Sequence, residues 1–412
     1  MSYILNPSIS WRNEGETVTL ELPFFGVSMS GTGYLRDVCD RFSRGPRSAA
    51  EVNVDEEVVA TLANAFVLLR EEDAAALRYG LLTRPDPPLG TAVGVSGLRS
   101  LQPNQTVLFD APVQTNHGLA ASVAFGGRRV REHLSALMAG GCNDDILMDL
   151  DLQRQAHRSA IPLMDAGEIV VLPEIETPTA AGKRVSYLVD VVASKGCRPL
   201  ALGGDHSITY YIVDSLRKSH TSFNVVQFDA HHDLYTSASP TGWFPEHINH
   251  ANVFRHVLDM AEVRCVTQIG LRDIFRGAPR RLTPTDYANS KLHSIPCRAA
   301  IRNEPNEVFS FLDRNVPVYI SFDVDVLEGG DNGGTGTPVI GGLPYWSAFE
   351  LMSFLFEHYS VVGIDFVEIG SQRLGSGSFA GFAARMIMLL LFMTGPTEPL
   401  SGYEGSSDPP RN

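Results

Sequence analysis

The chain has 412 residues, of which 47 are Asp or Glu and 33 are Lys or Arg, so its formal net charge is −14. So acidic a surface repels phosphate backbones, which argues against a nucleic-acid partner, whereas a cationic substrate would be attracted. A length of 412 residues with 44% hydrophobic content suits one large α/β domain plus a smaller one.

Five scattered cysteines form no CxxC motif, which predicts reduced thiols in a cytoplasmic protein rather than a disulfide framework. The opening stretch MSYILNPSISWRNEGE lacks the basic and apolar regions of a signal peptide. The longest apolar run, Met386 to Met393, is far shorter than the ~20 residues that span a bilayer. We therefore expect a buried core helix there and no membrane partner.

Residues 1–92 differ in pattern from the rest of the chain. TVTLELPFFGVSMSG reads as two short strands, and apolar residues then repeat at helical spacing from Tyr34 to Phe42. A second helix is predicted after an N-cap at Asp55, with an apolar face that extends to Leu69. This order predicts a small winged-helix-like α+β domain. Acidic residues around the second helix argue against DNA and favour a peptide or protein partner.

A linker is predicted at residues 93–104, and residues 105–396 then alternate between strand-like and helical segments. The predicted strands are TVLFD, EIVVL, PLALGG, FNVVQFD, CVTQIGL, VYISFDVDVL and VVGIDFVEI. Their near-continuous apolar character predicts a parallel sheet covered on both faces, with functional sites at the carboxyl ends of its strands. Residues 397–412 are predicted to be a disordered tail.

The stretch VVQFDAHHDLY ends a predicted strand in carboxylates and imidazoles. Side chains alternate along a strand, so Asp229, His231 and Asp233 are expected on one face and His232 on the other. The alternative is a polar strand end whose carboxylates lie in water.

Two other strands end in similar residues: His206 follows PLALGG, and YISFDVDVL contributes Asp323 and Asp325. Burying four carboxylates without compensation would cost several kcal/mol per charge, so we expect cations there. Four carboxylates and two imidazoles form a mainly oxygen site that suits two Mn²⁺ ions, with Fe²⁺ or Ni²⁺ as alternatives. Two such ions ~3.5–4 Å apart can share and activate a water molecule, which predicts metal-assisted hydrolysis.

The ordered motifs GGDHS, FDAHHD, SFDVDVL and GTGTP resemble those of the ureohydrolase family of arginases and agmatinases. The resemblance implies a three-layer α/β/α arginase-like fold with a parallel central sheet, in trimers or hexamers. It assigns the ligands of one manganese ion as His206, Asp229, Asp233 and Asp323. It assigns those of the other as His231, Asp229, Asp323 and Asp325.

The resemblance also assigns two catalytic residues, which join Asp233 in the expected catalytic set. Glu368 in VVGIDFVEIGS matches the family acid that pairs with the substrate guanidinium; the alternative is a surface glutamate. His250 in INHANVF matches the histidine that passes a proton to the leaving amine, and His247 competes for that role.

The substrate is expected to differ from free arginine. Tyr235 and Phe275 stand where arginases carry polar groups that hold the α-amino and α-carboxylate groups. The N-terminal module resembles a small winged-helix element that binds precursor peptides, which favours conversion of peptide arginine to ornithine and urea. The alternatives are a small-molecule ureohydrolase acting on agmatine, a guanidino acid or guanidine, and a catalytically silent binding protein.

Overall fold

The chain divides into two compact units, residues 1–81 and 82–412. The computed structural model describes residues 2–6, 9–15, 17–22, 27–65, 67–71, 81–82, 89, 91–92, 98, 101–115, 123–139, 145–171, 177–235, 248–273, 291–329, 334–370 and 376–400. Most of the predicted linker at residues 93–104 lies outside these ranges.

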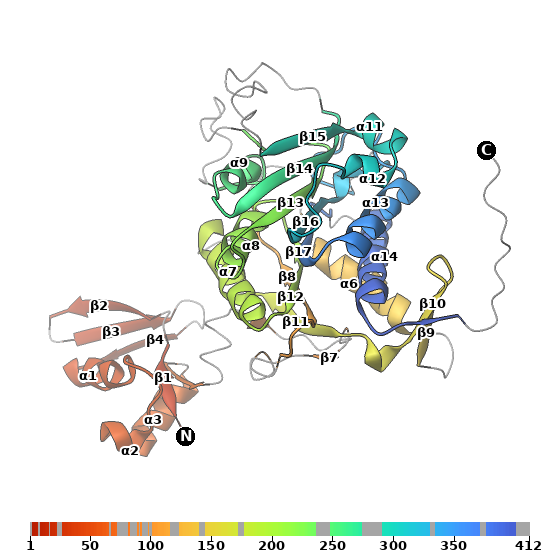
Figure 1. Ribbon diagram of the computed structural model, residues 1–412. Helices are drawn as coiled ribbons and strands as arrows, with labels where there is room; N and C mark the ends of the chain where they lie inside the picture. The colour runs from red at the N-terminus through yellow and green to blue at the C-terminus, as the bar shows by residue number, and fades with distance from the viewer. Residues whose placement is uncertain are drawn as a thin grey trace. The chain divides into compact units, whose positions relative to one another are not determined.

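Within its described residues, the first unit combines short antiparallel strands with helices α1, α2 and α3 (Figure 1). Its elements are β1 (Tyr3–Leu5), β2 (Ser10–Glu14), β3 (Thr17–Leu22), β4 (Val27–Gly31), α1 (Gly33–Phe42), α2 (Ala49–Val52), α3 (Glu56–Asn64) and β5 (Leu68–Arg70). Strands β2, β3 and β4 form one antiparallel sheet, and β1 pairs with β5. The strands and helices enclose an apolar core that includes Leu20, Phe42 and Leu62.

The predicted second helix of this unit is shorter than expected. Asp55 caps it as predicted, because its side chain accepts a hydrogen bond from the backbone N–H of Glu57 at 2.8 Å. The helix ends at Asn64, however, and Leu69 belongs to strand β5. The apolar pattern continued past the helix because a buried strand also needs apolar residues.

The second unit contains the predicted parallel sheet. Its eight parallel strands, in spatial order, are β15 (Leu292–Pro296), β14 (Val263–Leu271), β13 (Phe223–Phe228), β16 (Val318–Asp323), β17 (Val361–Val367), β12 (Arg198–Gly203), β8 (Thr106–Ala111) and β11 (Leu163–Ile169). Two-residue strands β6 (Leu81–Leu82) and β7 (Thr91–Ala92) lie beyond them at the β11 edge. The predicted strand EIVVL is displaced, since β11 ends at Ile169.

Helices cover both faces of this sheet, which makes the three-layer α/β/α arrangement (Figure 1). On one side lie α7 (Pro178–Ser194), α8 (Ile208–Leu216) and α9 (Val253–Leu258). On the other lie α6 (Gly126–Ala139), α13 (Tyr345–His358) and α14 (Ser376–Thr394). The short helices α11 (Cys297–Arg302) and α12 (Pro305–Val308) follow strand β15.

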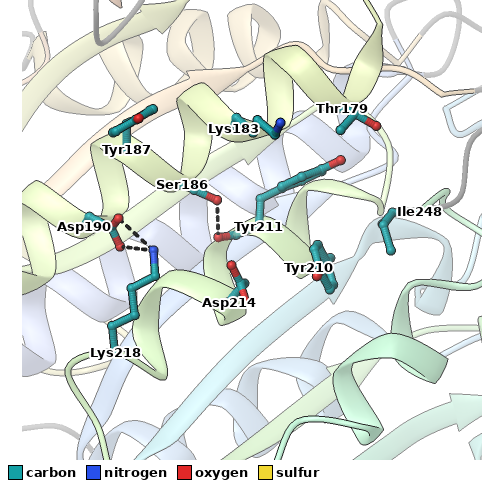
Figure 2. A pocket seen from close by; sticks show the side chains of 10 residues that line it. All are labelled: Thr179, Lys183, Ser186, Tyr187, Asp190, Tyr210, Tyr211, Asp214, Lys218 and Ile248. Atoms are coloured by element: carbon teal, nitrogen blue, oxygen red, sulfur yellow. Dashed lines mark hydrogen bonds and ion pairs between the residues drawn. The ribbon is translucent and has the colours of Figure 1, made fainter.

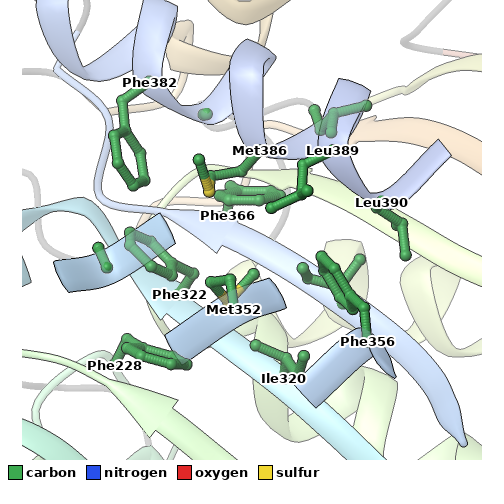
Figure 3. Close-up of a cluster of buried hydrophobic side chains, with 14 of the residues drawn as sticks. Phe228, Ile320, Phe322, Met352, Phe356, Phe366, Phe382, Met386, Leu389 and Leu390 are labelled. Atoms are coloured by element: carbon green, nitrogen blue, oxygen red, sulfur yellow. The ribbon is translucent and has the colours of Figure 1, made fainter. Parts of the chain in front are cut away.

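The core between the sheet and α13 and α14 contains several aromatic side chains among aliphatic ones. Figure 3 shows Phe228, Phe322 and Phe366 of the strands facing Met352 of α13 and Met386 of α14. The side chain of Phe322 stacks on that of Phe228, with ring centroids 5.2 Å apart. This packing fixes the strands whose carboxyl ends carry the motifs.

Residues 386–392 are buried in α14, which confirms the predicted core helix. Among the described helices, none combines the length and apolarity that a membrane crossing requires. A small antiparallel sheet joins β9 (Ile146–Asp149), β10 (Arg154–His157) and β18 (Glu398–Pro399). The predicted disordered tail therefore begins with an ordered strand, because its backbone finds partners on β10; residues 401–412 lie outside the described chain.

Candidate metal centre and active site

Of the three motif-bearing strands, β13 and β16 are neighbours in the sheet, and β17 alone separates β16 from β12. Because all of them are parallel, their carboxyl ends meet at one edge. His206 follows β12 in the turn before α8, Asp229 follows β13 directly, and Asp323 is the last residue of β16. The sheet topology thus gathers residues that are up to 117 positions apart in sequence (323 − 206).

Contrary to the sequence-based prediction, Asp229, His231 and Asp233 do not lie on one face of a strand. Strand β13 ends at Phe228, so the segment from Asp229 to Asp233 is a loop, and Asp233 has a left-handed backbone with φ of 50°. Asp325 lies in the 3₁₀ helix η3 (Val324–Val326) rather than on a strand. The side chains nevertheless converge, because the loop and the helical turn redirect them toward the same point.

The first cluster surrounds Nδ1 of His206. Carboxylate oxygens of Asp233, Asp229 and Asp323 lie 2.9, 3.2 and 3.4 Å from this nitrogen. The imidazole is fully buried, and Asp229 and Asp323 are at most 3% exposed. One nitrogen facing three carboxylates is the arrangement expected around a shared cation.

The second cluster surrounds Nδ1 of His231. Oδ2 of Asp325 lies 2.9 Å and Oδ1 of Asp229 lies 3.5 Å from this nitrogen. Asp229 therefore reaches both clusters, with one oxygen directed to each histidine. The two groups that could hold a metal ion share this carboxylate.

Two buried atoms in these clusters lack a hydrogen bond of acceptable geometry. They are Nδ1 of His206 and Oδ2 of Asp325. Buried polar atoms without such partners are rare and costly. Both atoms are metal-ligand types, so the residues present fit a pair of divalent cations.

The electrostatics of the site require positive charge. Burial, aided by the carboxylates of Asp325 and Asp229, raises the pKa of Asp323 well above its usual range. Burial and the Asp229 carboxylate likewise raise the pKa of Asp233 to about 7. Bound cations would keep these groups ionised at neutral pH.

Further buried polar residues form hydrogen bonds with the candidate ligands. Nε2 of His206 lies 2.8 Å from Oγ of Ser321, which in turn donates to Oδ1 of Asp365 at 2.8 Å. Gln227 donates to Oδ2 of Asp229 at 2.6 Å and accepts from Gln268 at 2.7 Å. Sequence reasoning missed these residues, although polar side chains inside otherwise apolar strands were a signal for them.

Glu368 lies beside the metal clusters and is only 3% exposed, so the surface-glutamate alternative is wrong. It follows strand β17 with a left-handed backbone, φ of 59°, and its N–H donates to the carbonyl of Gly204 at 3.0 Å. Its Oε1 accepts from the backbone N–H of His206 at 2.9 Å. Burial, followed by the Asp205 carboxylate, raises the pKa of Glu368 well above its usual value, and a cation close to it would favour the ionised form.

His250 lies in the turn that precedes α9, with a side chain that is 13% exposed. Its Nδ1 lies 3.4 Å from Oγ1 of Thr115 and 4.0 Å from Oδ2 of Asp205. Burial lowers the pKa of His250, against the opposing effect of Asp205. The competing residue His247 lies outside the described residues, as does Phe275.

Tyr235 closes the loop that carries Asp229 and Asp233, and it is 41% exposed. Its ring lies against that of His232, with centroids 4.8 Å apart. Nδ1 of His232 accepts from the backbone N–H of Leu234 at 2.9 Å. The side chain two residues after the metal-ligand motif is therefore an aromatic ring, which lies against the imidazole of His232.

A groove of about 510 Å³ runs between α7 and α8 (Figure 2). Ser186 of α7 donates to the carbonyl of Tyr211 at 3.0 Å, and Lys218 pairs with Asp190 at 2.8 Å. Among the described residues that line this groove, none is a candidate ligand or catalytic residue. The groove and the two metal clusters therefore share no described residue.

The model of the Arginase family matches residues 104–393. The mitochondrial guanidino acid hydrolase of Homo sapiens is 29% identical over 68% of this chain and 75% of its own length. The N(1)-aminopropylagmatine ureohydrolase of Thermococcus kodakarensis is 27% identical over 65% of this chain and 84% of its own. The arginase of Medicago truncatula shares the fold, with a TM-score of 0.59 and 22% identity over 83% of this chain and all of the other.

The matched region contains all eight strands of the parallel sheet and both clusters of buried His and Asp side chains. The first 81 residues, with their antiparallel strands, lie outside it. The chain therefore belongs to the arginase family of metal-dependent ureohydrolases.

Proposed function

We propose that this enzyme hydrolyses a guanidinium group and releases urea at two manganese ions held by His206, His231 and four aspartates. The observation that carries the proposal is the sharing of Asp229 between two buried clusters, each with a histidine nitrogen at its centre. When bound there, the two cations would activate a water molecule for attack on the guanidinium carbon.

The residues proposed for the two ions are those assigned from the sequence motifs. Asp229 and Asp323 would contribute to both sets, His206 and Asp233 would complete one set, and His231 and Asp325 would complete the other. Manganese is proposed because carboxylate oxygens dominate both sets and thiolates take no part in them.

Glu368 is proposed to bind the guanidinium group of the substrate. Two hydrogen bonds hold Glu368 in place. Its backbone N–H donates to the carbonyl of Gly204, and its Oε1 accepts from the backbone N–H of His206. A carboxylate can pair with the planar guanidinium fork through two parallel hydrogen bonds, which orients the carbon for attack. His250 is proposed to deliver the proton that the leaving amine needs.

Small guanidino compounds are the substrate class that we favour. The human and Thermococcus kodakarensis relatives act on a guanidino acid and on an agmatine derivative, according to their names. The exposed ring of Tyr235 offers apolar contact at the rim rather than a partner for the α-amino and α-carboxylate groups of free arginine. We therefore propose agmatine-like or guanidino-acid substrates ahead of arginine.

An arginine residue in a peptide is the second candidate. The feature that favours it is the N-terminal unit, which has a core of its own and lies outside the family match. Such a unit could hold a peptide while an arginine side chain enters the site. In that case the product would be a peptide that contains ornithine.

The test is urea release by the manganese-loaded full-length enzyme from agmatine, 4-guanidinobutyrate, free arginine and an arginine-containing peptide. We expect the largest kcat/KM for one of the first two compounds. Turnover of the peptide alone would select the second candidate, and urea from none of the four would contradict the proposal.

Glu368→Gln tests guanidinium binding, because it keeps the shape of the side chain and removes its charge, and Glu357→Gln is its matched control. We expect it to lose about 2–5 kcal/mol of binding to the substrate cation, which is the usual cost of removing one partner from a buried pair. Glu357→Gln changes an exposed glutamate of α13 and should leave kcat/KM unchanged.

A further inference from the structure

Thr115 lies between Asp205 and His250 and is 4% exposed. Its hydroxyl donates to Oδ2 of Asp205 over 2.6 Å and lies 3.4 Å from Nδ1 of His250. The imidazole and the carboxylate are themselves 4.0 Å apart, too far for a direct hydrogen bond. The threonine hydroxyl therefore bridges the two.

The carboxylate at the far end of this bridge is firmly held. Oδ1 of Asp205 accepts from both the backbone N–H and the hydroxyl of Ser207. Oδ2 accepts from the backbone N–H of Thr115 as well as from its hydroxyl. Asp205 is 2% exposed, so these four donors replace the water that would otherwise surround it.

The direction of these hydrogen bonds fixes the tautomer of the histidine. A hydroxyl has one hydrogen, and that of Thr115 goes to Asp205. In the contact with His250 the threonine oxygen must then accept, so Nδ1 of the imidazole carries the hydrogen. Nε2 keeps its lone pair and is the atom that can take up a proton.

We propose that Thr115 and Asp205 are positioning residues that keep His250 in the Nδ1–H tautomer, so that proton transfer takes place at Nε2. The inference rests on the proposed function, in which His250 carries a proton from the attacking water to the leaving amine. Nε2 would accept that proton to form an imidazolium, and would release it to the amine nitrogen as the carbon–nitrogen bond breaks. The ring then returns to its starting state, and the Asp205 charge stabilises the transient cation through the hydroxyl.

If the Thr115 hydroxyl served only to hold two segments together, its removal would have little effect on kcat. Backbone hydrogen bonds already join the segment of Thr115 to that of Asp205. The N–H of Asp205 donates to the carbonyl of Val113 at 2.9 Å, and that of Gly204 to Ala111 at 2.9 Å. A Cβ atom on Gly204 would lie 1.8 Å from the Val113 carbonyl oxygen, which shows how closely the segments approach. Thr115→Val keeps all of these backbone contacts and removes only the hydroxyl.

The experiment compares Thr115→Val with Thr115→Ser in the manganese-loaded full-length enzyme, using whichever guanidino substrate the unsubstituted enzyme hydrolyses fastest. We expect Thr115→Val to lower kcat by about 10–100-fold, part of the usual effect of a general acid–base group. KM and manganese content should change less than about twofold. Thr115→Ser should recover most of the loss, because it restores the hydroxyl.

A second measurement reads the tautomer without any turnover. In ¹⁵N-histidine NMR spectra, with His250 assigned from the signal that His250→Asn removes, we expect the Nδ1–H form in the enzyme and in Thr115→Ser. In Thr115→Val we expect a shift toward the Nε2–H form.

The possible results separate the inference from the proposed function. Full kcat in His250→Asn would overturn the inference together with the proton-transfer role proposed for His250, whereas the test of the proposed function itself is urea release by the unsubstituted enzyme. A large loss in His250→Asn, with unchanged kcat and tautomer in Thr115→Val, would overturn the inference alone. Equal losses of kcat and manganese in the Val and Ser variants would assign Thr115 a structural role and would also overturn it.

Discussion

The two units of this chain bury different kinds of residue. Among the described part of residues 1–81, Asn6 is the one buried polar side chain, and the rest of the core is apolar. In the second unit buried aspartates, histidines and glutamines gather at the carboxyl end of the sheet. The first unit is held together by apolar burial, whereas the second also encloses charge that needs cations.

This difference assigns the chemistry to the second unit. The four aspartates and two histidines all lie between residues 206 and 325, inside the region that matches the family. We expect changes within the first unit to leave the bond-breaking step unchanged. Three substitutions and one thiol reagent test the difference between the two units.

Asp229→Asn should have the largest effect. One carboxylate approaches both histidine nitrogens, so its loss removes a ligand from each metal set. We expect urea formation to fall by about 10³-fold or more, comparable to removing a main electrostatic element of an active site. Asp37→Asn, which alters an exposed aspartate of the first unit, is the matched control and should leave the rate unchanged. A loss of less than about tenfold in Asp229→Asn would contradict the shared-ligand arrangement.

Phe42→Ala should destabilise the first unit alone. Phe42 is fully buried in that unit's core, and truncation of a buried phenylalanine costs about 3–5 kcal/mol. In urea denaturation we expect an early transition for the first unit, with kcat for small guanidino substrates unchanged. Phe309→Ala makes the same change in the core of the second unit and should shift the unfolding transition of that unit to lower urea concentration. A parallel loss of kcat in Phe42→Ala would show that the two units are coupled.

Ser321→Ala should weaken metal binding without removing a ligand. Its hydroxyl links Nε2 of His206 to Asp365, and such outer contacts typically contribute about 10–100-fold in metal affinity. Manganese titration of the two proteins by calorimetry measures the change. Ser215→Ala removes another buried hydroxyl, one that donates to Ser186 on the outer helices, and should not alter the affinity. Equal affinities for Ser321→Ala and the unsubstituted enzyme would contradict the link.

The smallest expected effect concerns the Cys39 thiol of the first unit. Burial, with a smaller contribution from Asp40, raises the pKa of this thiol from 9.0 to about 12. The folded-state pKa lies above the unfolded value, so the stabilising contribution is complete below pH 9 and is lost as pH rises toward 12. At pH 8 a thiol reagent should leave Cys39 unmodified and should label it faster in Phe42→Ala, as peptide mass spectrometry can show. Rapid labelling of the unsubstituted protein would contradict its burial.

Sequence patterns predicted the parallel sheet because its central strands are long and almost wholly apolar. The antiparallel strand β10, with sequence RQAH, has no such signal. It depends on pairing with β9 and β18, the latter more than 240 residues away, and that contact leaves no local pattern.

The metal residues were predictable by type, but their geometry was not. Asp233 and Glu368 have left-handed backbones, which residues other than glycine adopt mainly when their surroundings hold them there. For Glu368 the restraint comes from Gly204, 164 positions away (368 − 204), so no local pattern could reveal it. The same holds for Thr115, which meets Asp205 and His250 only once the sheet has formed.

The most direct test of the two-ion proposal is anomalous X-ray diffraction at the manganese edge from crystals of the full-length protein grown with Mn²⁺. Our account predicts two peaks, one beside Nδ1 of His206 and one beside Nδ1 of His231, with the Asp229 carboxylate between them. A single peak, or peaks away from both histidines, would contradict it.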